Sequence, residues 1–174
     1  MGDSSSEAPQ AGPEAGRADA VSGFARSELF DRTFHEGMSL VEETAAYLDG
    51  AGRQDSKLLS RNAALAYASE SMRLTTRLMQ VASWLLVQRA VREGDMAPEA
   101  AFDASYRLAA ETAEDRAEAA IESLPPPLAD LVSRSERLFE RVRHLDSRMY
   151  AEAGDAPPHP VLSQLERLKN AFGG

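Results

Sequence analysis

The feature that most constrains the fold of this chain is the segment LMQVASWLLV at positions 78–87, which carries no charged side chain. Drawn as an α-helix, it makes about three turns, and no side of the helix is suited to water. It is too short to cross a bilayer, which requires about 20 apolar residues. The segment therefore predicts a helix covered by protein on several sides, with four candidate residues in the core or in a subunit contact: Leu78, Met79, Trp84 and Leu85.

Four α-helices are predicted by apolar residues that recur with the 3.6-residue period. Serines at 27 and 56 are suited to N-caps, glycines at 50 and 94 to helix ends, and the prolines at 125–127 to a helix break. The expected helices cover residues 27–49, 57–93, 98–123 and 128–152. The predicted fold class is all-α, an antiparallel bundle of three to four helices with a long central second helix.

The composition along the chain predicts one helical domain between two tails. Residues 1–22 offer almost no large apolar group to bury, which predicts a disordered acidic tail. Residues 23–152 form the expected bundle, and residues 153–174 form a flexible tail that starts with a proline-containing linker.

The expected helix lengths suggest a second subunit. At about 1.5 Å per residue, the helix over 57–93 spans about 55 Å, whereas the helix over 27–49 spans only about 35 Å. Their short connection makes them antiparallel, so the first helix ends near the level of residue 80 and leaves part of 78–87 uncovered. We expect a homodimer to cover this overhang; the alternative is a core built within one chain.

Charge is unevenly distributed over the expected helices. The chain carries a net charge of -9, which disfavours binding to nucleic acid or anionic lipid. The second expected helix is basic and its neighbours are acidic, a pattern that suits antiparallel packing better than a nucleic-acid stripe. The acidic faces are candidate docking surfaces for basic partners, or else solvated faces that keep the protein soluble; they include Glu36, Glu43, Asp103 and Glu114.

The C-terminal tail contains a short amphipathic pattern after its linker. If residues 161–172 are drawn as a helix, one face carries four apolar side chains: Val161, Leu165, Leu168 and Phe172. So short a helix is not stable alone in water. We expect the segment to order in the groove of a partner, and the alternatives are a cap on its own bundle or an inert tail.

The sequence carries no motif for catalysis. The three histidines lack the spacing of a di-iron or zinc motif, and no glycine-rich phosphate loop or nucleophile elbow occurs. We expect a protein without enzyme activity, catalytic residues, cofactor or metal. The absence of cysteine and of a signal peptide is typical of a cytoplasmic protein. Two other classes stay open, a metal- or cofactor-dependent helical enzyme and a DNA-binding transcriptional regulator.

Two stretches resemble a known family. The sequences FHEGMSLVEETAAYLDG at 34–50 and LAYASESMRLTTRLMQVASWLLVQRAVREGDM at 65–96 are similar to the alphaproteobacterial regulator of CtrA degradation family. The resemblance is distinctive over roughly residues 27–100, whereas the later expected helices agree in pattern but are less diagnostic.

The resemblance implies a helical-bundle dimer that acts as an adaptor for the ClpXP protease. Members of the family help to deliver cell-cycle regulators, including the transcription factor CtrA, at the swarmer-to-stalked transition. The implied partners are ClpX and ClpP, the response regulator CpdR and the cyclic-di-GMP effector PopA. The implied location is the cytoplasm, with transient gathering at a cell pole. No binding position is carried over from the family to individual residues of this chain.

Overall fold

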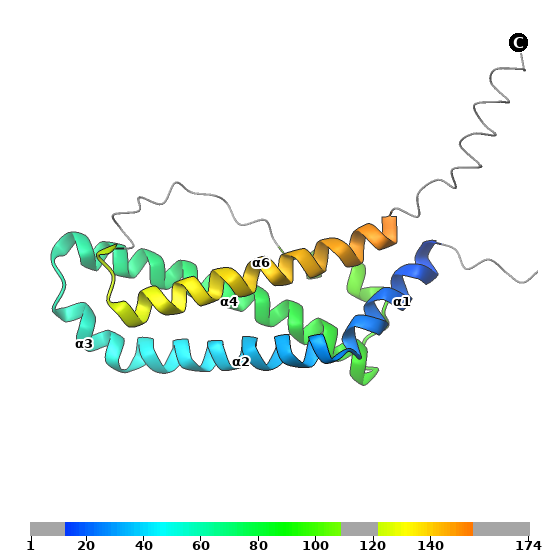
Figure 1. Ribbon diagram of the computed structural model, residues 1–174, viewed down its shortest axis with the longest axis horizontal. Helices are drawn as coiled ribbons and strands as arrows, with labels where there is room; N and C mark the ends of the chain where they lie inside the picture. The colour runs from blue at the N-terminus through cyan, green and yellow to red at the C-terminus, as the bar shows by residue number, and fades with distance from the viewer. Residues whose placement is uncertain (1–12, 109–121, 155–174) are drawn as a thin grey trace, which may run out of the picture.

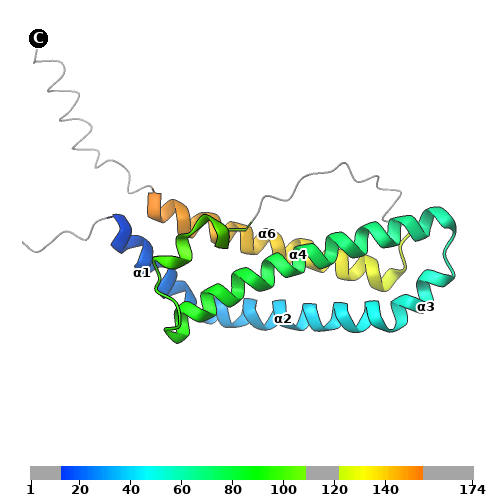
Figure 2. The ribbon, with the colours of Figure 1, turned by 180° about the vertical axis from the view of Figure 1, so that it is seen from behind.

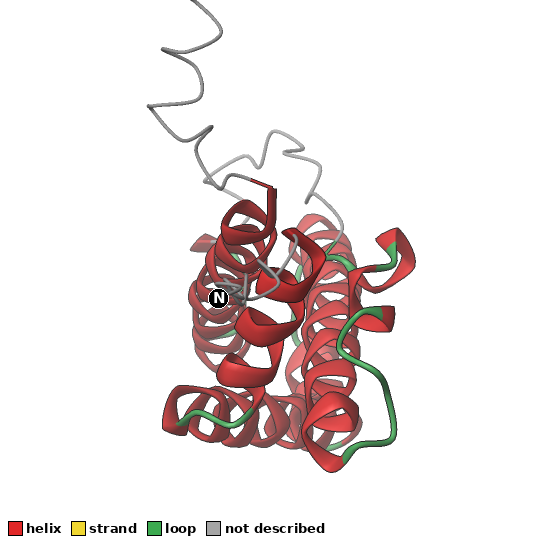
Figure 3. Ribbon diagram, turned by 90° about the vertical axis from the view of Figure 1, so that its right-hand side faces the viewer, coloured by secondary structure: helices red, strands yellow, loops and turns green. Residues whose placement is uncertain are grey.

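The computed structural model describes residues 13–108 and 122–154, and the regular elements in these two segments are all helices. They gather around one long axis, as the end-on view shows (Figure 3). The expected all-α helical bundle is confirmed. The elements are α1 (Pro13–Ala25), α2 (Glu28–Asp49), α3 (Ala51–Lys57), α4 (Arg61–Glu93), the short 3₁₀ helices η1 (Ala100–Phe102) and η2 (Ala104–Tyr106), and α6 (Pro126–Gly154).

The three long helices differ in direction. Helix α2 is antiparallel to α4 and to α6, whereas α4 and α6 run the same way (Figure 1). Two contacts fix this parallel register, because Arg77 meets Ser135 and, further along both helices, Trp84 meets Asp146. Helices α2 and α4 approach closely at Gly37, where an added Cβ would lie 2.7 Å from Cδ1 of Leu85.

The predicted ends of two helices are found at the expected residues. The Ser27 side chain accepts a hydrogen bond from the Phe30 backbone N–H at 3.2 Å, which caps α2. Gly94 ends α4 with a φ of 82°, a left-handed conformation that costs glycine little.

The connection between α2 and α4 differs from the prediction. Residues expected as a loop form the short helix α3, and Ser60 rather than Ser56 caps the long helix by accepting from the Ala63 N–H at 3.3 Å. Gly52 makes this corner possible, because an added Cβ would lie 2.6 Å from the Tyr67 hydroxyl oxygen. The long helix therefore begins at Arg61.

The predicted disordered N-terminal tail is wrong over residues 13–22. Residues 13–22, expected to be disordered, belong to α1, while residues 1–12 lie outside the described residues. Val21 is only 2 % exposed, and the Phe24 ring lies 5.6 Å from the Trp84 ring. Helix α1 docks on α4 and α6 through a small apolar surface that includes Val21, Phe24 and Ala25.

The predicted third α-helix is also wrong over the part that the structure describes. Residues 98–108 form η1, η2 and irregular backbone instead of an α-helix. The Asp103 carboxylate accepts hydrogen bonds from the Ser105 N–H at 2.8 Å and the Ser105 hydroxyl at 2.7 Å. This local turn competes with helix formation. The alanines at 109, 113, 117 and 120 lie outside the described residues.

Candidate interaction surface

The inner side of segment 78–87 is covered within one chain. Leu78, Trp84 and Leu85 are 3 %, 2 % and 0 % exposed, respectively. Trp84 packs against Phe24 of α1, and its indole N–H donates to Oδ1 of the buried Asp146 at 3.0 Å. Helix α2 reaches the end of α4, where Asp31 pairs with Arg92, so the overhang expected from the helix lengths does not exist, and α1 adds cover over Trp84.

A polar layer lies one to two turns before Trp84 on the same inner side. Arg77 is 2 % exposed, and its Nη1 donates to the Ser135 hydroxyl at 2.9 Å. Its Nη2 also lies 3.7 Å from Oε1 of Glu136. The Ser135 hydroxyl in turn donates to the Val132 carbonyl at 2.7 Å. Because a buried guanidinium must keep its partners, this layer sets how α4 and α6 align.

The outer face of α4 is different, because large apolar side chains are exposed along it. They are Leu65, Met72, Met79 and Leu86, with exposed fractions of 65 %, 73 %, 65 % and 51 %. Each follows the one before by seven residues, a spacing that keeps them on nearly one line of the helix. Met79 is thus not part of the core of the single chain, and the alternative given for it, a subunit contact, stays a prediction.

Small polar residues alternate with these large ones. Ser69, Thr76 and Ser83 are exposed and follow the 3-4 spacing typical of coiled-coil positions. We call these seven residues, Leu65, Ser69, Met72, Thr76, Met79, Ser83 and Leu86, the α4 seam. The alternation of large and small side chains leaves holes in the surface that side chains of a second helix can fill.

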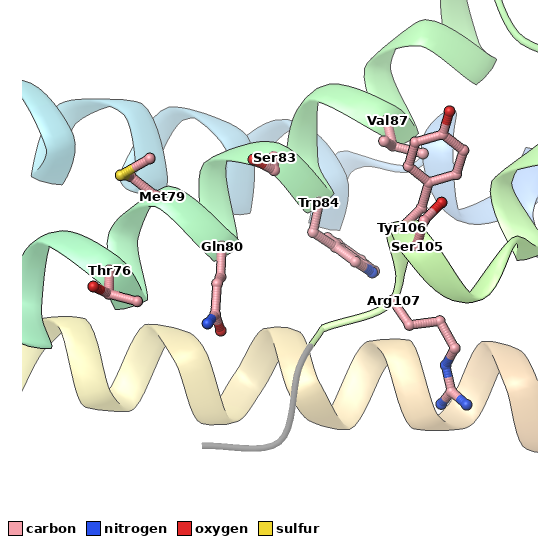
Figure 4. A pocket seen from close by; sticks show the side chains of 9 residues that line it. All are labelled: Thr76, Met79, Gln80, Ser83, Trp84, Val87, Ser105, Tyr106 and Arg107. Carbon is pink, nitrogen blue, oxygen red and sulfur yellow. The ribbon is translucent and has the colours of Figure 1, made fainter. Parts of the chain in front are cut away.

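One such hole is a hollow of about 470 Å³ between α4 and η2. Figure 4 shows Met79, Ser83 and Trp84 on the α4 side and Tyr106 next to Val87. Nη2 of Arg107, at the edge of the hollow, lies 3.4 Å from Oδ2 of Asp146. The full lining is Thr76, Met79, Gln80, Ser83, Trp84, Val87, Ser105, Tyr106 and Arg107.

The acidic candidates of α2 are engaged within the chain. Oε1 of Glu36 lies 2.5 Å from Nη2 of Arg141, and Oε2 of Glu43 lies 2.8 Å from Nη2 of Arg134. The hydrogen bond to Glu43 raises the pKa of the Arg134 guanidinium. These two glutamates therefore link α2 to α6, a role that the sequence did not suggest because the arginines are distant in the chain.

The other candidates lie elsewhere or cannot be placed. Asp103 caps η2, and the hydrogen bonds from Ser105 lower the pKa of its carboxyl. Glu114 and the C-terminal candidates Val161, Leu165, Leu168 and Phe172 lie outside the described residues. The sequence analysis did not predict the α4 seam. The seven-residue repeat of Leu65, Met72, Met79 and Leu86 is the signal in the sequence that indicates it.

Neither a metal site nor a membrane span is found in the described segments. Over residues 13–108 and 122–154, no three His, Cys, Asp or Glu side chains gather where they could hold a metal ion. None of the helices described is both long and apolar enough to pass through a membrane.

Comparisons with known proteins agree with the resemblance in the sequence. The family model described as "Protein of unknown function (DUF1465)" matches residues 21–172. The crystal structure of RcdA from Caulobacter crescentus CB15 is 70 % identical, with a TM-score of 0.61, and the match covers 74 % of this chain and 96 % of that chain. No curated protein matches the sequence. The expected similarity to the regulator of CtrA degradation family is confirmed.

Proposed function

We propose that this chain, which belongs to the DUF1465 family, is a non-enzymatic adaptor that helps to deliver cell-cycle regulators such as CtrA to the ClpXP protease. The observation that carries the proposal is the 70 % identity to RcdA over 96 % of that chain. The proposed partners are ClpX and ClpP, CpdR, PopA and the cargo itself. The proposed setting is the cytoplasm, with gathering at a cell pole during the swarmer-to-stalked transition.

The architecture is suited to such a role. An adaptor raises the effective concentration of cargo near the protease, so it needs a stable body that presents surface for partners. The inner face of α4 supplies the stable body, since Leu74, Leu78, Val81 and Leu85 are all at most 3 % exposed. The α4 seam supplies exposed apolar surface on the same helix, and such surface is typical of a protein contact.

We also propose that the adaptor forms a homodimer. The seam is the face of α4 best suited to a second copy, because matched 3-4 spacings allow two such helices to interlock side by side. Sedimentation at micromolar concentration is expected to show a species of twice the 18.9 kDa chain mass.

Reconstituted degradation tests the adaptor proposal directly. CtrA, ClpXP, CpdR and PopA with cyclic-di-GMP are mixed with and without this protein, and the loss of CtrA is followed on gels. We expect faster loss of CtrA only when the protein is present. A destabilised variant, Trp84→Ala, is checked by circular dichroism so that loss of fold is separated from loss of delivery. An unchanged rate with the folded protein contradicts the proposal.

A further inference from the structure

The α4 seam is an exposed coiled-coil-like surface whose partner within the described residues is missing. Met72, Met79 and Leu86 each expose at least half of their surface, and the hollow between α4 and η2 lies beside Met79. A segment that covers this seam must be an amphipathic helix with large apolar side chains at spacings of three and four.

We infer that residues 161–172 of the same chain dock as a helix in the groove formed by the α4 seam and η2. This segment has the required pattern, since Val161, Leu165, Leu168 and Phe172 follow one another at spacings of four, three and four. The seam offers small side chains at Thr76 and Ser83, where large side chains of the docked segment would insert. The inference concerns the isolated chain and does not depend on the adaptor proposal.

The described chain ends at Gly154, close enough to the α4 seam for a short linker to bring residues 161–172 back to it. Because α4 and α6 run in parallel, α6 ends near the C-terminal end of α4, on the side of α1 (Figure 1). Asp146 is level with Trp84, so Gly154 lies eight residues, or about 12 Å of helix, past that level. Six linker residues, 155–160, span up to about 20 Å, and a path of about 12 Å along the axis combined at right angles with about 10–15 Å sideways is about 16–19 Å long.

Length and direction then set the register. Helical residues 161–172 are about 18 Å long, and the seam from Leu86 back to Met72 measures about 21 Å. The segment returns antiparallel to α4, with Val161 near Leu86, Leu168 near Met79 and Phe172 near Thr76. In the view from behind, α4 runs along most of the length of the bundle (Figure 2).

Docking of the tail and binding of a second copy would exclude one another, because both need the same seam. The C-terminal segment is therefore an internal competitor that covers the apolar face in the dilute monomer and is displaced when a second copy binds. Truncation after Gly154 should expose the seam and strengthen self-association.

Cysteine labelling tests the inference cleanly, because the chain contains no cysteine. Met79→Cys is placed in the full chain and in a chain that ends at Gly154, and its reaction with a maleimide is followed in dilute protein. We expect labelling about tenfold slower in the full chain, which corresponds to a docked state populated about ten to one. Ser83→Cys repeats the measurement with a nearly isosteric change, in case the loss of Met79 weakens docking.

Leu65→Cys is the matched control. Leu65 and Met79 are both 65 % exposed, but Leu65 lies 14 residues, or about 21 Å, further along the seam, beyond the reach of the docked segment. It should label at the same rate in both chains. Under mild oxidation, Leu168→Cys combined with Met79→Cys should give a disulfide within one chain, whereas Leu168→Cys combined with Leu65→Cys should not.

Each other outcome overturns the inference. Equal labelling of the Met79→Cys variant in the full and truncated chains means that the tail does not cover the seam. Slow labelling that speeds up on dilution to the same rate in both chains means that only a second copy covers it. Slow labelling in both chains at every concentration means that another part of the chain does. A disulfide found only between two chains places the tail on a neighbouring molecule.

Discussion

The inner and outer faces of α4 belong to one helix but differ in burial, because the inner face is enclosed and the outer face is exposed. Trp84 and Met79 are five residues apart, and their exposed fractions are 2 % and 65 %. The inner face is enclosed by α1, α2 and α6, whereas the outer face presents the α4 seam to its surroundings. A run without charges can therefore mean two apolar faces with separate partners, rather than one helix buried on all sides.

The comparison also shows what each face contributes. The inner face mixes large apolar side chains with a buried arginine whose partners lie on α6. The outer face has no such buried charge, because Ser69, Thr76 and Ser83 are exposed and uncharged. The inner face fixes one arrangement of helices, and the outer face keeps a surface that different helices can cover.

The largest difference between the faces is expected at Trp84. Trp84→Ala should reduce the free energy of unfolding by about 3–5 kcal/mol, because it removes a buried ring and leaves Asp146 without its indole donor. Urea melts of Trp84→Ala and of Met79→Ala measure the contrast. Similar losses in the two variants would show that the inner and outer faces are not distinct.

The next largest effect is expected at the polar layer. Arg77→Ala should cost about 3 kcal/mol, because it leaves a hole and removes the donor to Ser135. Arg77→Met keeps most of the stem and should cost less. Chemical denaturation of both variants measures the loss, and a negligible cost for Arg77→Ala would mean that the layer does not hold α4 against α6.

A smaller effect is expected where α2 meets α6 at the surface. Glu43→Gln should cost less than about 1 kcal/mol, since the ion pair with Arg134 is half exposed to solvent. The cost should shrink further as salt is raised. Thermal melts at low and high salt test this, and a cost that does not depend on salt would point to packing rather than charge.

The smallest effect on stability is expected on the outer face. In a chain that ends at Gly154, kept dilute so that it is monomeric, Met72→Glu together with Leu86→Glu should change the free energy of unfolding by less than about 0.5 kcal/mol, because both side chains are already exposed. The same pair should weaken homodimer formation, measured by sedimentation at micromolar concentration. A stable dimer in this double variant would place the subunit contact elsewhere.

The sequence predicted those features of the fold that depend on local chemistry. Ser27 as a cap, Gly94 as a left-handed end and the helix that ends at Glu93 can all be read from a few neighbouring residues. Helix α1 could not be read in this way, because residues 13–22 are weakly amphipathic and gain their stability from docking on α4 and α6. Asp103 and Ser105 were overlooked as turn residues within an alanine-rich stretch.

For the candidate surface, too, local sequence predicts some features, whereas others depend on contacts between distant parts of the chain. The burial of Trp84 and Leu85 follows from the apolar run, but the exposure of Met79 depends on where α1, α2 and α6 lie. The pairing of Glu36 with Arg141 joins residues more than 100 positions apart, which no local pattern reveals. The role of the C-terminal residues stays a prediction.

The parallel direction of α4 and α6 has a consequence for the order of folding. Helices α2 and α4 are joined by a short corner, so their contacts close small loops and can form early. Contacts of the parallel pair close a long loop, because Arg77 and Ser135 are 58 residues apart. We expect an α2–α4 hairpin to form before α6 docks, so that a nascent chain exposes the polar layer until synthesis has passed residue 154.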